Sequence, residues 1–284
     1  MKRNVALLVG ATAGIGKETA RLLAQMNYQV IIVGRNQVAG ETVAAELSGQ
    51  FIQADVSLLG ETRRVADAVR AQVQTLDVIV HTADALAIKR EQTAEGFEKS
   101  LATNYLSRFL LNGLLHDLLR NGQQPRIIHV AAANVPLTLT EANFPLPPTA
   151  SSFTGHNVGQ AANDYYGLAF AERFRAEGIR INILNPGIVD TDIRRRGNGG
   201  PFLRGLMAVM ELLMRPVTQS PADYARLVAA VATGAHPVAN QAVFIDRKGK
   251  PMKPRADRLD RDRQQYVWTQ SEQLTGITTT LIQA

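Results

Sequence analysis

"VALLVGATAGIGKETARLLAQM", residues 5–26, joins an apolar run to a helical pattern through a turn that holds Gly10, Gly14 and Gly16. The run has the composition of a buried strand, and the segment after the turn carries its apolar residues on one helical stripe. Glycines let the backbone turn tightly and approach a ligand closely, and a helix N-terminus attracts a pyrophosphate. The stretch therefore predicts a nucleotide-binding strand–turn–helix unit at the start of the chain.

The alternation of apolar runs and helical patterns continues along the chain. Further strands are expected at "QVIIV" (29–33), "FIQADV" (51–56), "LDVIV" (76–80), "RIIHV" (126–130), "RINIL" (180–184) and "AVFI" (242–245), and helices at about 38–47, 60–73, 96–119 and 157–176. The runs are apolar throughout, as expected for parallel strands that are covered on both faces. We therefore expect an α/β fold, with one domain over 1–284 and a single doubly wound parallel sheet of about seven strands.

Two irregular insertions interrupt this pattern. Residues 133–155 contain four prolines, and residues 192–221 contain an apolar segment rich in methionine. Ligands of such sheets bind beyond the carboxyl ends of the strands, so both insertions are expected to form walls of a substrate site. The second is expected to be a lid over an apolar substrate; a surface helix packed on the core or a dimer contact is the alternative.

Composition removes several classes of function. The chain has no cysteine, which excludes disulfides, a thiol nucleophile and a cysteine metal cluster, and no metal site is expected. The first apolar run begins at Asn4, which leaves no room for a signal peptide, and no apolar stretch reaches the roughly 18 residues of a membrane span. We expect a cytoplasmic protein without a membrane span.

The net charge is +6, and the densest basic stretch is "DRKGKPMKPRADRLDRDR", residues 246–263. Acidic residues alternate with the basic ones, and no aromatic stacking pattern accompanies them. A solvated tail explains this composition better than a nucleic-acid surface, so no nucleic-acid partner is expected.

Several motifs in order along the chain resemble the short-chain dehydrogenase/reductase family, and in particular its retinol-dehydrogenase-like branch. They are the Gly-x3-Gly-x-Gly turn, "GIGKETARLLA", "DVIVHTAD", "GFEKSLATNYLSRFLLNGLL", "GIRINILNPGIVDTDI" and "WTQSEQLTGI". The similarity runs from about residue 4 to residue 276. It implies a Rossmann fold, a nicotinamide cofactor and, because many relatives pair through helices, a homodimer or homotetramer.

The resemblance also assigns cofactor residues. Arg35 follows the second strand, where arginine suits the 2′-phosphate of NADP and an acidic residue would suit the 2′-hydroxyl of NAD. NADP(H) is therefore expected, although an exposed arginine at a helix start would look the same. The full set of expected cofactor contacts is Gly10, Thr12, Gly14, Ile15, Gly16, Arg35, Asp55, Val56, Ala83, Pro186, Gly187, Ile188 and Thr191.

One cofactor motif departs from the family. After the fourth strand the family usually has Asn-Asn-Ala-Gly, and this chain has His81-Thr82-Ala83-Asp84. Replacement of the glycine places a side chain where backbone normally passes close to the cofactor, and this puts cofactor occupancy in doubt.

The catalytic motif departs further. Members of the family use a tyrosine to exchange the proton, a lysine to lower the pKa of that tyrosine, a serine to polarise the carbonyl and an asparagine to maintain a water relay. Asn104 matches the asparagine. Ala132 stands at the serine position, and counting back from "GIRIN" places His156 at the tyrosine and Gln160 at the lysine.

A different register, built on Tyr165 or Tyr166, does not restore the motif. No lysine occurs between Lys99 and Lys248, so no Tyr-x3-Lys pair can be formed. On the helix, Tyr166 is expected to one side of the face that carries His156, and Tyr165 on the opposite face, in packing.

His156 has two interpretations. Histidine has an ordinary pKa near 6.5, so it can exchange protons near neutrality without an activating lysine. In that case Gln160 and Asn163, on the same helical face, would orient a substrate. The alternative is decay of the site, with His156 a structural polar residue at a helix start.

Three functions remain open at this point. One is a divergent NADP(H) oxidoreductase that acts on a bulky apolar small molecule, with hydride transfer in natural-product tailoring supported by His156 and Asn104. Another is a non-redox cyclase, isomerase or cycloaddition catalyst that works by orienting its substrate. The third is a non-catalytic NADP(H)-binding regulator or scaffold. The methionine-rich insertion favours an enzyme, because a scaffold has no need of an apolar pocket.

Overall fold

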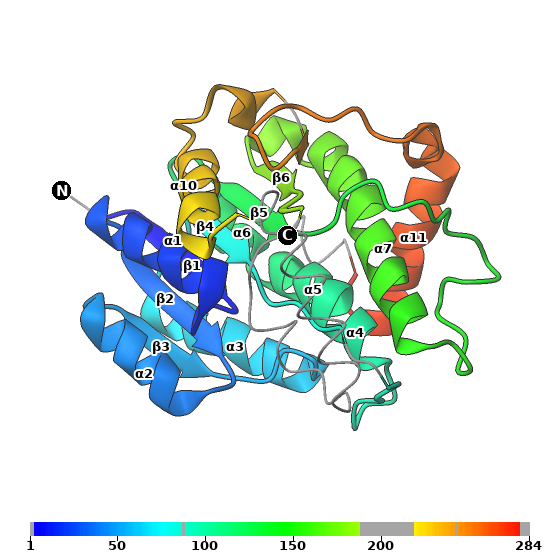
Figure 1. Ribbon diagram of the computed structural model, residues 1–284, viewed down its shortest axis with the longest axis horizontal. Coiled ribbons are helices and arrows are strands. Elements are labelled where there is room, and N and C mark those ends of the chain that lie inside the picture. Colours follow the sequence, from blue (N-terminus) through cyan, green and yellow to red (C-terminus); the bar gives the residue numbers. More distant parts are fainter. Residues whose placement is uncertain (1–2, 87–88, 188–218, 242, 279–284) are drawn as a thin grey trace.

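A computed structural model describes residues 3–86, 89–187, 219–241 and 243–278 of the chain. Its sheet has seven parallel strands in the order β3-β2-β1-β4-β5-β6-β7, which confirms the predicted fold class (Figure 1). The strands are β1 Val5–Val9, β2 Gln29–Gly34, β3 Gln50–Gln53, β4 Val78–His81, β5 Arg126–Val130, β6 Arg180–Leu184 and β7 Phe244–Ile245. The strand order reverses between β1 and β4, and ligands of doubly wound sheets bind in the crevice at that point.

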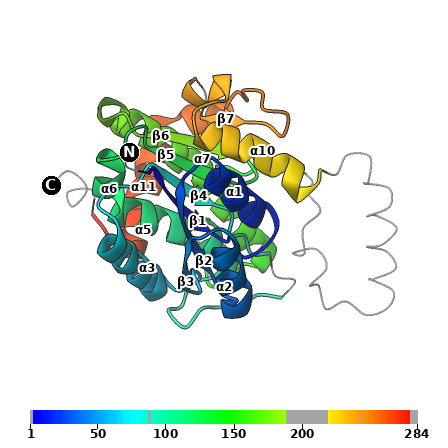
Figure 2. The ribbon, with the colours of Figure 1, turned by 90° about the vertical axis from the view of Figure 1, so that its left-hand side faces the viewer.

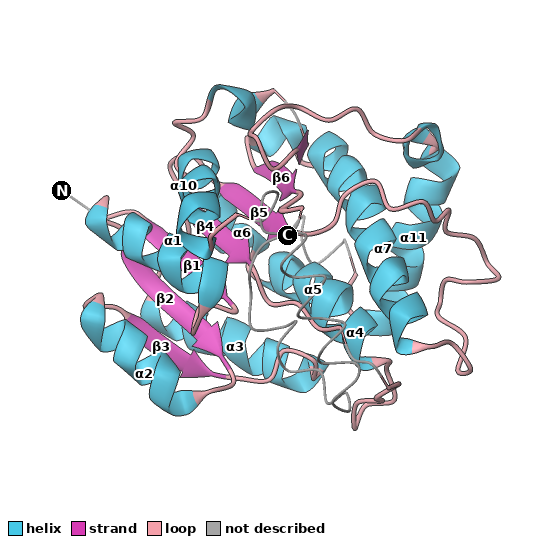
Figure 3. Ribbon diagram, viewed as in Figure 1, coloured by secondary structure: helices cyan, strands magenta, loops and turns pink. Residues whose placement is uncertain are grey.

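Helices cover both faces of the sheet, and Figures 2 and 3 show the two layers. One face carries α1 Gly14–Gln25, α2 Gln37–Glu46 and α10 Pro221–Ala232. The other face carries α3 Leu59–Gln72, α5 Ser107–Leu114, α7 Ser152–Arg173 and α11 Arg261–Thr275. Side chains alternate along β1, so that Val5, Leu7 and Val9 pack with the second group of helices while Ala6 and Leu8 pack with the first.

Several boundaries differ from the prediction. The third strand ends at Gln53, three residues before Val56, and β7 comprises two residues. The helix expected over 96–119 is divided into α4 Lys99–Leu101, a π-helical turn η1 Ala102–Leu106, α5, and α6 His116–Arg120. The helix α7 begins at Ser152 and not near 157, because the Ser151 side chain accepts a hydrogen bond from Thr154 N and caps the first turn.

The interpretation of residues 246–263 as a solvated tail is wrong. This segment contributes a short helix η5, Ala256–Leu259, and the start of α11, neither of which the sequence predicted. Arg258 is fully buried, and its Nε donates to Asp164 Oδ2 of α7 at 3.1 Å. Its Nη2 donates to the carbonyls of Val135 and Leu137, at 3.0 and 2.8 Å. The interleaved charges thus hold the C-terminal helix and the first insertion against α7.

The two insertions can be followed to different extents. In residues 133–155, Leu139 and Phe144 are buried in the same core cluster as α7 and α11. The expected lid over 192–221 lies outside the described residues up to position 218, and α10 begins at Pro221.

Candidate functional site

The glycine turn after β1 packs against the loop that follows β4. Gly10 has a φ of +90°, and a Cβ there would lie 2.4 Å from Ala83 N. A Cβ on Gly16 would lie 2.5 Å from Thr82 Oγ1, which donates to Val9 O at 3.0 Å. Gly14 also has a positive φ, of +57°, but no other residue comes within 4 Å of its Cβ position. Two glycines are therefore required by close packing, and the third faces open space.

The N-terminus of α1 can accept an anion. Its N-cap residue, Ala13, supplies no side-chain hydrogen bond, and no side chain among the described residues accepts from the first-turn amides. By contrast, α2, α7 and α10 begin after Asn36, Ser151 and Ser220, whose side chains accept from first-turn amides. Uncapped amides and the positive end of the helix fit a pyrophosphate, and the expected contacts Thr12 and Ile15 lie in this turn.

The remaining cofactor residues lie at the same edge of the sheet. Arg35 is exposed and directly follows β2. Asp55 and the buried Val56 follow β3, and Asp55 Oδ1 accepts from Ser57 N at 3.0 Å. The arrangement brings Arg35 and Asp55 to the carboxyl ends of neighbouring strands, where the adenosine half of a dinucleotide binds in this fold.

The strip after β6 is described only in part. Pro186 is half-buried and Gly187 is exposed with a φ of +60°, while Gly187 N donates to Asn185 Oδ1. Ile188 and Thr191 lie outside the described residues. The residues present therefore fit the pyrophosphate and adenosine parts of a dinucleotide.

At the other end of the crevice, the structure brings His156 and Asn104 together. The two residues come from α7 and η1, and His156 Nδ1 lies 3.0 Å from Asn104 Nδ2 and 3.2 Å from Ala85 O. Asn104 also accepts from Ala85 N at 2.7 Å and donates to Ala85 O at 2.9 Å, which fixes the orientation of its amide. The imidazole is 14% exposed, and no described residue makes a hydrogen bond to Nε2. Nε2 is therefore the ring atom left for a substrate.

Local packing explains why His156 is held in this place. Glu98, which is buried, accepts from Leu101 N at 2.8 Å and from Ser152 Oγ at 3.2 Å, so it joins the starts of α4 and α7. Gly155 makes this approach possible, because a Cβ there would lie 2.0 Å from Glu98 Oε2. Gly159 lies one turn further on, and its Cβ position is 3.5 Å from Asn104 Cβ.

Gln160 and Asn163 are used inside the protein. Gln160 is 2% exposed, and its Oε1 accepts from Ala132 N at 2.9 Å. Asn163 is fully buried, and its Nδ2 donates to Asn104 O at 2.9 Å and to Gly159 O at 3.0 Å. The expectation that Asn163 orients a substrate is wrong, because buried partners on neighbouring elements occupy its amide. For Gln160, only Nε2 remains without a hydrogen bond to the described residues.

A buried polar chain lies beneath the site. His81 Nε2 lies 2.8 Å from Asn112 Oδ1, and Asn112 Nδ2 lies 3.0 Å from His129 Nε2. The chain continues to Asn163, whose Oδ1 lies 2.9 Å from His129 Nδ1. Burial lowers the pKa of His81 to about 3 and the pKa of His129 well below its usual value. Both histidines are neutral at physiological pH and are structural.

Neither tyrosine of α7 reaches the site. The Tyr166 hydroxyl accepts from Asn112 Nδ2 at 3.2 Å, its ring stacks on His129, and burial raises its pKa. The Tyr165 hydroxyl contacts Arg258 and Asp257, on the opposite side of the helix. The prediction that Tyr165 lies in packing is confirmed, and Tyr166, expected to one side of the His156 face, is buried in packing as well.

Sequence reasoning missed Arg108 and the position of Asp84. Arg108 is 1% exposed, and its guanidinium donates to Ala83 O at 2.8 Å and to Val130 O at 3.2 Å, so it joins the carboxyl ends of β4 and β5. Burial lowers its pKa to about 10, and the charge of Asp84 opposes this change. Asp84 Oδ1 lies 3.7 Å from His156 Nδ1. An arginine within an apolar helix was the one available signal for Arg108.

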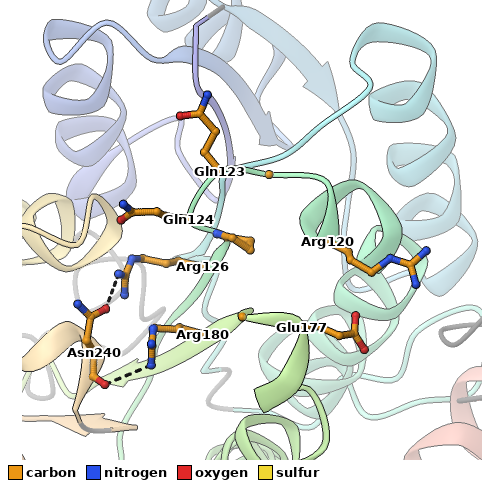
Figure 4. Close-up of a pocket in the computed structure, with 10 residues that line it drawn as sticks. Arg120, Gln123, Gln124, Arg126, Glu177, Arg180 and Asn240 are labelled. Carbon is orange, nitrogen blue, oxygen red and sulfur yellow. Dashed lines mark hydrogen bonds between the residues drawn. The ribbon is translucent and has the colours of Figure 1, made fainter.

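The described surface has a polar pocket at the other end of the strands, opposite the crevice (Figure 4). It has a volume of about 370 Å³ and includes Arg126 and Arg180, the first residues of β5 and β6. Arg126 Nη2 donates to Asn240 Oδ1 at 2.6 Å, and Arg180 Nη1 donates to Asn240 O at 3.2 Å. This pocket lies at the amino ends of the strands and is separate from the crevice.

The residues that the structure describes contain neither a metal-binding cluster nor a membrane-spanning helix. They include no group of three or more histidine, cysteine or acidic side chains that could hold a metal ion. None of their helices is both long enough and apolar enough to pass through a bilayer.

Comparison with known proteins gives several matches. A family model for short chain dehydrogenases matches residues 4–140. The chain is 33% identical over 207 residues to oxidoreductase andH of Emericella variicolor, a match that covers 69% of this chain but only 60% of that protein. It is 27% identical to polyprenol dehydrogenase of Mus musculus, over 96% of this chain and 84% of the relative. It is 26% identical to retinol dehydrogenase 12 of Homo sapiens, over 96% and 87%.

Solved structures share the fold. A short chain dehydrogenase from Salmonella enterica serovar Typhi has a TM-score of 0.64 at 19% identity and covers 87% of this chain and 96% of its own. A Shigella flexneri short chain dehydrogenase, solved in complex with NADP, has a TM-score of 0.65 at 17% identity and covers 87% and 98%.

Proposed function

The chain belongs to the short-chain dehydrogenase family of nicotinamide-dependent oxidoreductases, and we propose that it is a divergent member in which His156 replaces the tyrosine that exchanges the proton. The observation that carries this proposal is the placement of His156. Its Nδ1 is held by Asn104 and Ala85, and its Nε2 is left without a hydrogen bond among the described residues. A partly buried ring with one nitrogen held and the other available is the arrangement of a general acid or base.

The proposed cofactor is NADP(H). The uncapped turn at Ala13 and the open space at Gly14 would receive the pyrophosphate, and Arg35 would pair with the 2′-phosphate. Asp55 and Val56 would border the adenine. When bound, the nicotinamide would supply or accept a hydride. Arg35 is the residue that distinguishes NADP(H) from NAD(H), because a guanidinium pairs with a phosphate dianion and gains little from a hydroxyl.

In the reductive direction, His156 Nε2 would donate its proton to the substrate oxygen as the carbonyl carbon is reduced. In the oxidative direction, the same atom would take the hydroxyl proton. In both directions Ala85 O would accept from the protonated Nδ1 of the ring, and Asn104 would hold the backbone of Ala85 in place. Gln160 would keep the end of β5 in position through Ala132 N, with its Nε2 available to a substrate. These roles need neither a lysine nor a serine.

The proposed substrate is a bulky apolar small molecule. The names of two relatives state an action on retinol or polyprenol, which are apolar alcohols, and both matches extend over 96% of this chain. The missing serine is consistent with this choice, since Ala132 places a half-buried methyl group where the family has a hydroxyl. As in many relatives, we propose a homodimer or homotetramer.

A non-redox function is the second candidate. It is supported by the Asp84 side chain, which stands in the cofactor loop beside His156. A carboxylate next to an imidazole can perform acid–base chemistry without hydride transfer, as an isomerase or cyclase requires.

The experiment separates the two candidates in two steps. Fluorescence titration with NADPH tests binding first, and the absence of binding would remove the oxidoreductase proposal. Absorbance at 340 nm is then followed with retinal and long-chain prenyl aldehydes for the wild type and His156→Gln. We expect NADPH oxidation that His156→Gln abolishes. Binding without oxidation of NADPH, together with conversion of a substrate, would favour the second candidate.

A further inference from the structure

We propose that Asp84 is the positioning partner of His156, so that the change of glycine to aspartate after β4 and the change of tyrosine to histidine on α7 form one linked replacement. The two positions are 72 residues apart in sequence, and the fold places Asp84 Oδ1 3.7 Å from His156 Nδ1. This inference rests on the proposed role of His156 and adds a residue that sets the state of the imidazole.

One oxygen of the Asp84 carboxylate is buried without a hydrogen-bond donor among the described residues. The Asp84 side chain is 32% exposed, yet its Oδ1 is closed off from solvent and accepts no hydrogen bond from the described residues. A buried carboxylate oxygen without a donor is costly, and such atoms usually have a functional or structural explanation. The His156 ring is the cationic group within ion-pair distance of this oxygen among the described residues. Protonation of His156 would therefore compensate the buried oxygen.

Neutral His156 can carry its proton on Nδ1 or on Nε2, and the neighbouring groups decide which form is favoured. Asn104 is held by both of its bonds to Ala85, so the hydrogen of its Nδ2 that faces Nδ1 favours the form with the proton on Nε2. Ala85 O and Asp84 Oδ1 are both acceptors and favour the form with the proton on Nδ1. Only the second form leaves an acceptor at Nε2. Asp84 Oδ1 and Ala85 O therefore both favour the form with the proton on Nδ1, and in this form Nε2 can take a proton from a substrate.

Two other charged side chains, Arg108 and Glu98, belong to the elements around Asp84 and His156. Arg108 of α5 lies behind Asp84, is buried, and interacts with Asp84 electrostatically. The attraction between the two charges stabilises the guanidinium of Arg108 in its buried position. Glu98 of α4 faces the start of α7, where Leu101 N and Ser152 Oγ occupy its oxygens. Asp84 is therefore the carboxylate that is free to respond to His156.

The test uses cofactor-free protein and needs no substrate. Uniformly ¹⁵N-labelled protein is titrated from pH 5 to 9 while the imidazole nitrogens are followed by long-range ¹H–¹⁵N correlation. The chain has five histidines, and His156→Gln identifies the signals of His156. In Asp84→Asn we expect the midpoint of the His156 transition to fall by about one pH unit. We also expect neutral His156 to move toward the form protonated on Nε2.

Matched variants complete the design. Asp67→Asn removes one carboxylate from an exposed site on α3 and should leave the His156 signals unchanged. Asp84→Glu keeps the charge and should retain most of the wild-type midpoint. Backbone amide spectra report whether each variant is folded; if Asp84→Asn does not fold, Asp84→Glu and Asp84→Ser provide the same comparison.

The outcomes distinguish this inference from the proposed function. A His156 transition that is the same in wild type and Asp84→Asn overturns the partnership, whatever the effect of His156→Gln on turnover. A transition that moves as expected supports the partnership, even if His156→Gln has full activity and the proposed function fails.

Discussion

The two ends of the crevice differ in whether backbone atoms or side chains form the proposed site. At the cofactor end, backbone makes the site: Gly10 and Gly16 allow close packing, and the uncapped first turn of α1 presents its amides. At the catalytic end, side chains make the site, through His156, Asn104 and Asp84. A site made of backbone needs particular conformations, whereas a site made of side chains can change its chemistry within the same fold. This chain has the family's glycine turn after β1, whereas Asp84 after β4 and His156 on α7 stand where the resemblance places a glycine and a tyrosine.

The largest expected effect tests whether the catalytic end is active. His156→Gln keeps a polar side chain of similar size but cannot exchange a proton, so kcat should fall about 10²- to 10⁴-fold. NADPH affinity, measured by fluorescence, should remain within about twofold, because the ring is not among the cofactor contacts. Undiminished kcat would show that the catalytic end has been abandoned, as in the alternative interpretation of the sequence.

The next effect is a loss of stability at acid pH, and it is expected from the buried histidines His81 and His129. His81 and His129 have pKa values lowered by burial, so the unfolded chain binds protons that the folded chain does not. Stability is then complete above the unfolded value near 6.5 and is lost as the pH falls toward the folded value. For His81, whose pKa in the folded protein is about 3, the loss of stability between pH 7 and pH 5 should be about 2 kcal/mol.

Urea denaturation at the two pH values measures this loss for the wild type and for His81→Gln. The variant should show about 2 kcal/mol less pH dependence than the wild type. An equal pH dependence in the two proteins would mean that His81 is charged in the folded state.

An effect on stability of comparable size is expected from the backbone at the cofactor end. In Gly10→Ala the new Cβ would meet Ala83 N at 2.4 Å with φ at +90°, so the free energy of unfolding should fall by about 2–3 kcal/mol. Gly14→Ala is the matched control, because it has a positive φ but open space, and it should cost about 1 kcal/mol. Equal losses in the two variants would contradict the close packing of the loops after β1 and β4.

The smallest effect concerns cofactor choice. Arg35 is exposed, so its contact with a 2′-phosphate is partly screened by solvent. Arg35→Ala should weaken NADPH binding about tenfold and leave NADH binding nearly unchanged, as measured by fluorescence titration. An equal loss of affinity for NADPH and NADH would show that Arg35 contacts the pyrophosphate or stabilises the fold and does not select the 2′-phosphate.

The sequence was sufficient for those parts of the fold that depend on local patterns. Seven apolar runs predicted seven parallel strands, since the strands are buried on both faces. Counting back from "GIRIN" along the motif that resembles the family singled out His156, and the structure places its ring 3.0 Å from Asn104. The helix boundary at Ser152 was missed, although Ser151 was available as a capping residue.

Features that depend on distant contacts could not be predicted. Arg258 looked solvated because its partners, Asp164 and the carbonyls of the first insertion, are about 90 or more residues away. Asn163 shares the face of His156, but the sequence does not reveal that η1 presents the carbonyl of Asn104 to it. The proximity of Asp84 and His156 likewise follows from the tertiary arrangement of β4 and α7.

The hydrogen bond from Ala132 N to Gln160 Oε1 restricts how the site can evolve. A lysine at position 160 has no acceptor atom, so it would leave that amide without its partner. A tyrosine at position 156 would meet the carboxylate of Asp84, which opposes ionisation of a phenol. Each step back toward the tyrosine and lysine of the family is therefore unfavourable while the other changes remain. A chain with tyrosine at 156 and lysine at 160 would therefore need compensating substitutions at Asp84 and beside Ala132 N.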